Sequence, residues 1–177
     1  MFAVRHNWSP KTDAFGSAWL QRYVARSAIA GLVGLAALVA TAAPADVCKE
    51  AYEARNVEAE VQCQNAATAG DRDAQFGYGL VLFSGRGQES NPSASLKWLR
   101  LAASQGHFLA RVMLGRLLSD SDMLSADLRN PVEGYAWWVV AGERDAVRNL
   151  SEKLSATQLA NAKLLAADYQ AKYGVVK

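Results

Sequence analysis

Apolar residues after residue 45 recur at intervals of three and four, which is the period of an amphipathic helix. In the helix that contains AQFGYGLVLFSG, two such stripes run side by side. The stripe expected to face a partner helix comprises Ala74, Tyr78, Val81 and Leu82. The second stripe comprises Asp73, Phe76, Leu80, Phe83 and Ser84. A helix with two apolar sides is more often buried than used for binding, and both interpretations stay open at this point.

Capping residues indicate where two of the helices begin. Asn91-Pro92 and Asn130-Pro131 each place a capping side chain before a proline at the first helical position. Glu133 would complete a capping box with Asn130. The sequence therefore predicts helices that begin at both prolines.

Two more helices are expected near the end of the sequence, in RDAVRNLSEKL and in SATQLANAKLLAADYQAKYG. The second opens with a capping box formed by Ser155 and Gln158 and closes at Gly174. An array of helical hairpins needs such a pair to shield its last apolar face. In total, about eight helices are expected after residue 45.

The chain repeats itself after Gly70. AQFGYGLVLFSG, from Ala74, matches ARVMLGRLLSDS, from Ala110, at an offset of 36 residues. Gly70 matches Gly106 at the same offset, whereas NPSASLKW matches NPVEGYAW at an offset of 39 because the second loop is longer. A period in the mid-thirties with variable loops is typical of a solenoid of helical hairpins.

Each joint between repeats consists of two small residues, a stop and the start of the next helix. Gly70 and Gly106 suit the left-handed conformation that ends a helix. In a third copy aligned on its tryptophan, the small pair is Ala141–Gly142 and Asp145 takes the place of the glycine. The residues that follow the stop are then Asp71, His107 and Ala146. A position that varies in this way is expected to be a loosely constrained helix start rather than a catalytic centre.

These segments resemble the Sel1-like repeat family, which is related to the tetratricopeptide repeats. The matching features are the Ala-x-x-x-x-Gly of AQFGYG and ARVMLG, the Gly-x-Gly of SGRGQ, and the Trp followed by Ala-Ala and Gly in WLRLAASQG. The resemblance spans about residues 58–145, although SDSDMLSADLRNP of the second repeat lacks the Gly-x-Gly loop. It implies an all-α fold, a right-handed α-solenoid of antiparallel helical hairpins, and an adaptor or scaffold rather than an enzyme.

The resemblance also places the second stripe on the concave surface where helical repeats bind peptides. The expected binding face consists of Phe76, Leu80, Phe83, Val112 and Arg116. Such a face would suit an apolar peptide segment that carries an acidic residue. The alternative is that so short an array has almost no concavity, and that Phe76 and Phe83 pack under the N-terminal hairpin.

Residues 1–45 indicate a secretory signal region. The uncharged apolar run 27–43 follows two arginines, and APAD places small residues before a predicted cleavage site after Ala45. A start at Val24 would give a signal of ordinary length. A retained membrane helix is the alternative, although a run of this length that is rich in Ala and Gly is short for a bilayer. We therefore expect a periplasmic or secreted protein, with inner-membrane anchoring as the alternative.

Cys48 and Cys63 are the only cysteines, and we expect them to form a disulfide because an even number in an exported chain favours one. The turn at Arg55 and Asn56 lies midway between them, so two antiparallel helices would bring both side chains together. A metal site would need further His or Cys ligands nearby, and a redox pair would favour a Cys-x-x-Cys motif; the sequence has neither.

Charge and motifs argue against nucleic-acid binding and catalysis. Residues 1–45 carry a charge of +3 and the remainder −1, with basic residues scattered singly. His107 is the only histidine after the first few residues, and the sequence has no nucleophile elbow, phosphate loop or metal cluster. No cofactor or metal is expected.

The sequence thus predicts four parts: a signal region (1–45), a disulfide-stapled hairpin (46–70), two Sel1-like repeats (71–145) and C-terminal capping helices (146–177). The expected function is that of a periplasmic interaction or scaffold module that binds a protein or peptide of unknown identity. The alternative is a small periplasmic enzyme or enzyme-associated factor in cell-wall metabolism. Two buried, convergent carboxylates in a pocket would favour that alternative. The oligomeric state does not follow from the sequence.

Overall fold

The computed structural model describes residues 43–85, 89–119 and 122–174, all of which belong to one compact unit, residues 40–177. Most of the predicted signal region lies outside the described residues. These residues form helices and no strand, so the predicted all-α class is confirmed for them. In chain order, the eight helices are α2 (Pro44–Ala54), α3 (Val57–Thr68), α4 (Arg72–Ser84), α5 (Pro92–Ser104), α6 (Phe108–Ser119), α7 (Pro131–Ala141), α8 (Arg144–Lys153) and α9 (Ala156–Tyr173).

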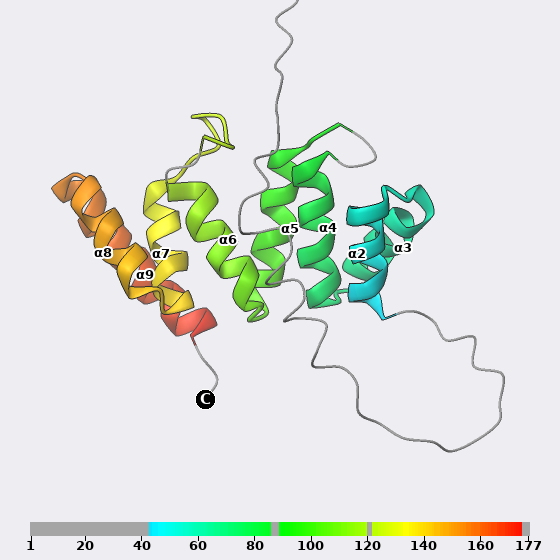
Figure 1. The fold of residues 1–177 in the computed structure, drawn as a ribbon. Helices are drawn as coiled ribbons and strands as arrows, with labels where there is room; N and C mark the ends of the chain where they lie inside the picture. The colour runs from blue at the N-terminus through cyan, green and yellow to red at the C-terminus, as the bar shows by residue number, and fades with distance from the viewer. Residues whose placement is uncertain (1–42, 86–88, 120–121, 175–177) are drawn as a thin grey trace, which may run out of the picture. The chain divides into compact units, whose positions relative to one another are not determined.

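The helices pack in chain order as successive hairpins (Figure 1). Each helix from α2 to α7 contacts the next one, and α2 also contacts α4. The last helix, α9, packs along α7. The predicted solenoid of helical hairpins is therefore confirmed. None of the described helices is both long enough and apolar enough to cross a membrane.

The joints between the hairpins are formed by glycine stops and by side chains that cap the next helix. The Asp71 carboxylate accepts a hydrogen bond from the amide of Ala74 at 2.7 Å, and Nδ1 of His107 accepts one from the amide of Ala110 at 3.1 Å. The glycine before each cap, Gly70 or Gly106, has a φ of 97° or 89° and ends the preceding helix in the left-handed region. The side chains that cap α5, α7 and α9 are those of Asn91, Asn130 and Ser155.

The third joint differs from the prediction. Gly142 ends α7 with a φ of 80°, and the amides of Gly142 and Glu143 donate to the carbonyls of Val139 and Trp138. The same pair of bonds occurs 36 residues earlier, at the end of α5. The predicted stop, Asp145, instead lies in the first turn of α8. The alignment on the tryptophan was wrong here because α7 has 11 residues where α5 has 13.

Two local predictions also fail. Gly174 follows α9 with a φ of −55°, so it is not a left-handed stop. Glu133 does not complete a capping box with Asn130, because only its amide bonds to the Asn130 side chain. Its carboxylate forms hydrogen bonds to Arg100 and Trp137 instead.

Buried side chains form two clusters joined by a layer of leucines. The N-terminal cluster surrounds the cysteines and contains the first stripe of α4, which confirms that this stripe faces the core. The C-terminal cluster forms where α7 packs against α8 and α9. The leucines between them come from α5 and α6 and are Leu96, Leu99, Leu114, Leu117 and Leu118.

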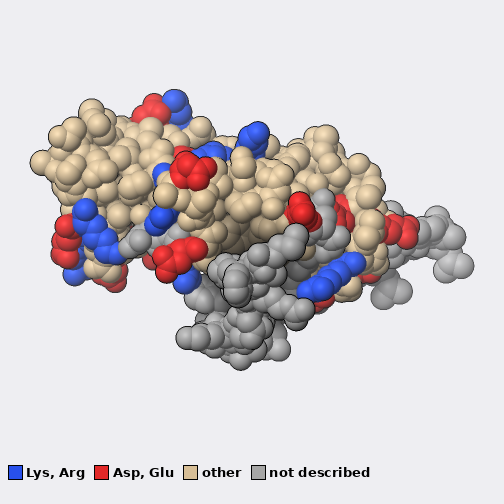
Figure 2. Space-filling view, turned by 90° about the horizontal axis from the view of Figure 1, so that it is seen from above, with Lys and Arg blue, Asp and Glu red and all other residues tan. Residues whose placement is uncertain are grey.

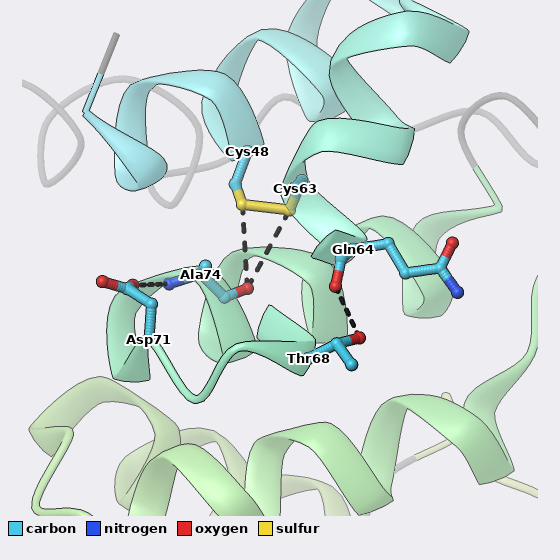
Figure 3. Close-up of a disulfide and its surroundings, with 6 residues drawn as sticks. All are labelled: Cys48, Cys63, Gln64, Thr68, Asp71 and Ala74. Atoms are coloured by element: carbon cyan, nitrogen blue, oxygen red, sulfur yellow. Dashed lines mark hydrogen bonds between the residues drawn. A yellow bond between two sulfur atoms is a disulfide. The ribbon is translucent and has the colours of Figure 1, made fainter. Parts of the chain in front are cut away.

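Cys48 of α2 and Cys63 of α3 form a disulfide, as predicted, with Cα atoms 4.8 Å apart (Figure 3). Both sulfur atoms lie against the carbonyl oxygen of Ala74, at 3.7 and 3.9 Å. The disulfide is buried, and Gly77 of α4 lies so close that a Cβ there would be 2.5 Å from the Cys48 Cβ. The bond therefore lies at the interface between the N-terminal hairpin and the first repeat.

Candidate functional site

The predicted binding face lies on α4 and α6, and its residues differ in depth. Phe76 is buried, with 8% of its surface exposed. Leu80, Phe83 and Val112 are half-buried, and Arg116 is exposed. The surface available to a partner on these helices is therefore provided by the last four residues, without Phe76.

Phe76 packs against His107, at the seam between the α4/α5 and α6/α7 hairpins. The two rings are stacked, with centroids 4.3 Å apart and planes 24° from parallel. His107 is 6% exposed, and its Nε2 lies 3.7 Å from Oδ1 of Asp73. Burial lowers the pKa of His107 to about 4, although the Asp73 carboxylate acts in the opposite direction. His107 is the capping residue of α6, so the predicted helix start is correct, but its side chain is not loosely constrained.

A polar cluster that sequence reasoning missed links α5 to α7. Nε and Nη2 of Arg100 donate to the two carboxylate oxygens of Glu133 at 2.7 and 2.8 Å. Nε1 of Trp137 donates to the same carboxylate at 3.1 Å. The Glu133 hydrogen bond raises the pKa of Arg100, and three donors satisfy a carboxylate that is almost fully buried. The one feature of the local sequence that indicates this cluster is a glutamate within the apolar segment PVEGYAWW.

An aromatic cluster holds the end of α9 against α7. The Trp137 ring lies 4.7 Å from that of Tyr169 and 5.7 Å from that of Tyr173, measured between centroids. Arg111 of α6 donates from Nη2 to the Tyr173 carbonyl at 2.6 Å and from Nε to the Ala103 carbonyl at 3.0 Å. Burial is the main cause that raises the pKa of Tyr169 to about 12, so its hydroxyl stays protonated at neutral pH. These contacts fix α9 in place.

An open hollow lies between α6, α7 and α8, and Trp138 is one of the residues that line it. Nε1 of Trp138 donates to Oγ of Ser119 at 3.2 Å. The residues that line the hollow are Ser119, Trp138, Ala146, Asn149, Leu150 and Lys153. No carboxylate is among them, so this hollow lacks the feature that would favour the enzyme alternative.

Charged side chains are dispersed over the face of the molecule shown in Figure 2, where basic and acidic groups alternate. Phosphate recognition requires clustered Lys and Arg, which this face does not present. Among the described residues, no group of three His, Cys, Asp or Glu side chains could hold a metal ion.

The Sel1 repeat family model matches residues 72–107, which run from the first residue of α4 to His107. The fold is similar to the crystal structure of c5321, a protective antigen present in uropathogenic Escherichia coli strains, which displays an SLR fold. That similarity has a TM-score of 0.64 at 27% sequence identity, and it covers 74% of this chain and 30% of that chain. The chain thus contains one matched Sel1 repeat within a fold similar to the SLR fold. No curated protein matches it.

The matched repeat contains the part of the predicted binding face that lies on α4. Sel1-like repeats form a fold that typically serves as a protein–protein interaction module. Leu80 and Phe83 lie in the matched repeat, whereas Val112 and Arg116 lie in the following helix, α6. The chain spans about a third of the length of the c5321 protein, so that protein's role as a whole is not transferred to it.

Proposed function

We propose that this protein is a periplasmic interaction or scaffold module that binds a protein or peptide through α4 and α6. The observation that carries the proposal is the half-exposed apolar surface of Leu80 and Phe83 within the matched Sel1 repeat. Val112 extends the apolar character onto α6, and Arg116 adds a positive charge. A partner segment with apolar side chains and an acidic residue would complement this face.

The proposed location rests on the leader and on the disulfide. A structural disulfide persists in an oxidising compartment such as the periplasm, and Cys48–Cys63 is buried in the core. Cleavage after Ala45 would remove the first two residues of α2, so that the mature chain would begin at Asp46. N-terminal sequencing of the protein from periplasmic extract tests this location: a chain that retains residues 27–43 would instead support inner-membrane anchoring.

A pull-down from periplasmic extract tests the binding face. Phe83→Asp introduces a charge at the apolar part of the face, and Arg116→Glu reverses its positive charge. We expect both variants to lose the bound partner, provided that circular dichroism shows them to be folded. Leu164→Asp is the matched control, because Leu164 is 73% exposed on α9 and lies outside the face. If the bound set is the same for all three variants and the unchanged protein, the proposed face is wrong.

A further inference from the structure

His107 joins two repeats through a hydrogen bond at the edge of its ring and a stacking contact on one face. Its Nδ1 accepts the amide of Ala110 in the first turn of α6, while its ring stacks on Phe76 of α4. Among the described residues it is the only histidine. The start of α6 and the seam with α4 therefore depend on the same imidazole.

The capping bond requires an imidazole that is not protonated at Nδ1. In the neutral ring, one nitrogen accepts and the other carries the proton, so an accepting Nδ1 places the proton on Nε2. Protonation of the ring makes both nitrogens hydrogen-bond donors. The N–H at Nδ1 would then point at the N–H of Ala110, and the capping hydrogen bond would be lost. The same proton would place a charge on a side chain that is only 6% exposed.

The charged groups around the ring compensate little for the free-energy cost of a buried, protonated imidazole. Asp73 of α4 lies 3.7 Å from Nε2, beyond hydrogen-bond distance, and its carboxylate already accepts from Nε of Arg72 at 3.1 Å. Arg72 opposes a charged ring, and on α6 the Arg111 guanidinium approaches Gly106, the residue before His107. Burial outweighs Asp73, and the pKa of His107 is lowered to about 4.

We propose that His107 makes the seam between α4 and α6 an acid-sensitive joint, which the neutral ring holds closed and the protonated ring releases. In the unfolded chain a histidine binds its proton near pH 6.5. The unfolded state therefore takes up a proton that the folded state excludes, so stability is lost as the pH falls from about 6.5 towards 4. At the equivalent joint, the Asp71 carboxylate caps α4 and needs no neutral imidazole.

Urea unfolding of the full chain at about pH 7.5 and about pH 5 tests the proposal. We expect the unfolding equilibrium constant of the unchanged protein to rise between the higher and the lower pH. This rise should be about tenfold larger than the rise for His107→Asn, whose side chain can cap α6 but cannot titrate. Asp71→Asn is the matched control, because it changes the equivalent cap of α4 and leaves His107 in place, so it should keep the acid response of the imidazole. An equal response in the unchanged protein and in His107→Asn would overturn the proposal.

A second measurement does not depend on the variant. Hydrogen exchange of the unchanged protein should show that the protection factor of the Ala110 amide falls with acidification before that of the Ala74 amide, which Asp71 caps. The ring of His107, followed by NMR, should titrate well below pH 6.5. Titration at or above that value, or loss of protection at both amides together, would overturn the proposal. This inference does not depend on the proposed binding role, since it is tested by folding alone.

Discussion

Asp71, His107 and Glu143 occupy equivalent places, each directly after a glycine with positive φ. Asp71 and His107 accept the amide of the third residue that follows, whereas Glu143 forms no side-chain capping bond. The local sequence predicts a helix start at such a position, because the glycine that ends one helix and the residue that caps the next are adjacent in the chain. It cannot predict that His107 is buried, because Phe76, which covers the ring, belongs to the preceding repeat.

Gly77 is a residue at which a single added methyl group should be costly. We expect Gly77→Ala to lower the free energy of unfolding by about 1–3 kcal/mol, because the new Cβ would overlap the buried Cys48 side chain. Urea denaturation measures the change.

Gly79→Ala is the matched control on the same helix. A Cβ at Gly79 would lie 3.1 Å from Cγ and Cδ2 of Leu99, a less severe overlap than the one at Gly77, so the loss should be smaller. Equal losses for the two variants would show that the disulfide does not set the packing distance between α2 and α4.

At the scale of single elements, α9 shows what periodicity predicts and what it leaves out. Its start is confirmed, because the Ser155–Gln158 capping box is a local feature. The hydrogen bond from Arg111 that holds the end of α9 was not predicted, because Arg111 lies 62 residues before Tyr173 in the sequence. Only two residues of α9 are fully buried, Ala162 and Ala166, and partly buried Leu159, Leu165 and Tyr169 pack against the same cluster.

Arg111→Met should loosen the end of α9. The substitution removes donors to the carbonyls of Tyr173 and Ala103, and we expect the free energy of unfolding to fall by about 1–3 kcal/mol. Hydrogen exchange at the last turn of α9 should rise at the same time. Lys172→Met is the control, because its ion pair with Asp168 is exposed and should matter little. Unchanged exchange in Arg111→Met would contradict the proposed role of these two bonds.

The α2/α3 hairpin depends on its disulfide. Removing both cysteines by Cys48→Ala and Cys63→Ala should lower the free energy of unfolding by about 3 kcal/mol, because the bond closes a loop of 15 residues. Urea denaturation of the double variant measures this loss, and reduction of the unchanged protein should reproduce it. A further loss when the double variant is treated with the same reductant would show that the effect arises elsewhere.

At the scale of the whole molecule, the described residues place one core cluster around the disulfide and another under α9, with the buried leucines of α5 and α6 between them. The sequence predicted the repeat, the disulfide and most helix starts, because each depends on spacing or on adjacent residues. It placed the third stop wrongly because Gly142 had been assigned to a small pair. It also missed the Arg100–Glu133 pair and the Trp137 aromatic cluster, which join residues that lie far apart in the chain.

The two clusters lie at opposite ends of the described array of helices, and this arrangement has a measurable effect. In an array where each hairpin contacts its neighbours, a local loss of stability spreads mainly to the adjoining unit. Reduction of the disulfide should therefore increase hydrogen exchange in α2 and α3 and leave the amides of α7 and α9 largely unchanged. The double cysteine variant serves as the control, since the reductant should not alter its exchange. A uniform increase along the chain would indicate a single cooperative unit instead.

The constant distance between Gly70, Gly106 and Gly142 has a consequence for engineering. The glycines are 36 residues apart, and this distance holds even where the loop is three residues longer, because α7 is two residues shorter than α5 and Gly142 follows it directly. The block from Asp71 to Gly106 thus carries its own first cap and its own last turn. Tandem duplication of this block would leave every joint with a cap and a stop, and would lengthen the protein by one complete hairpin without a new linker.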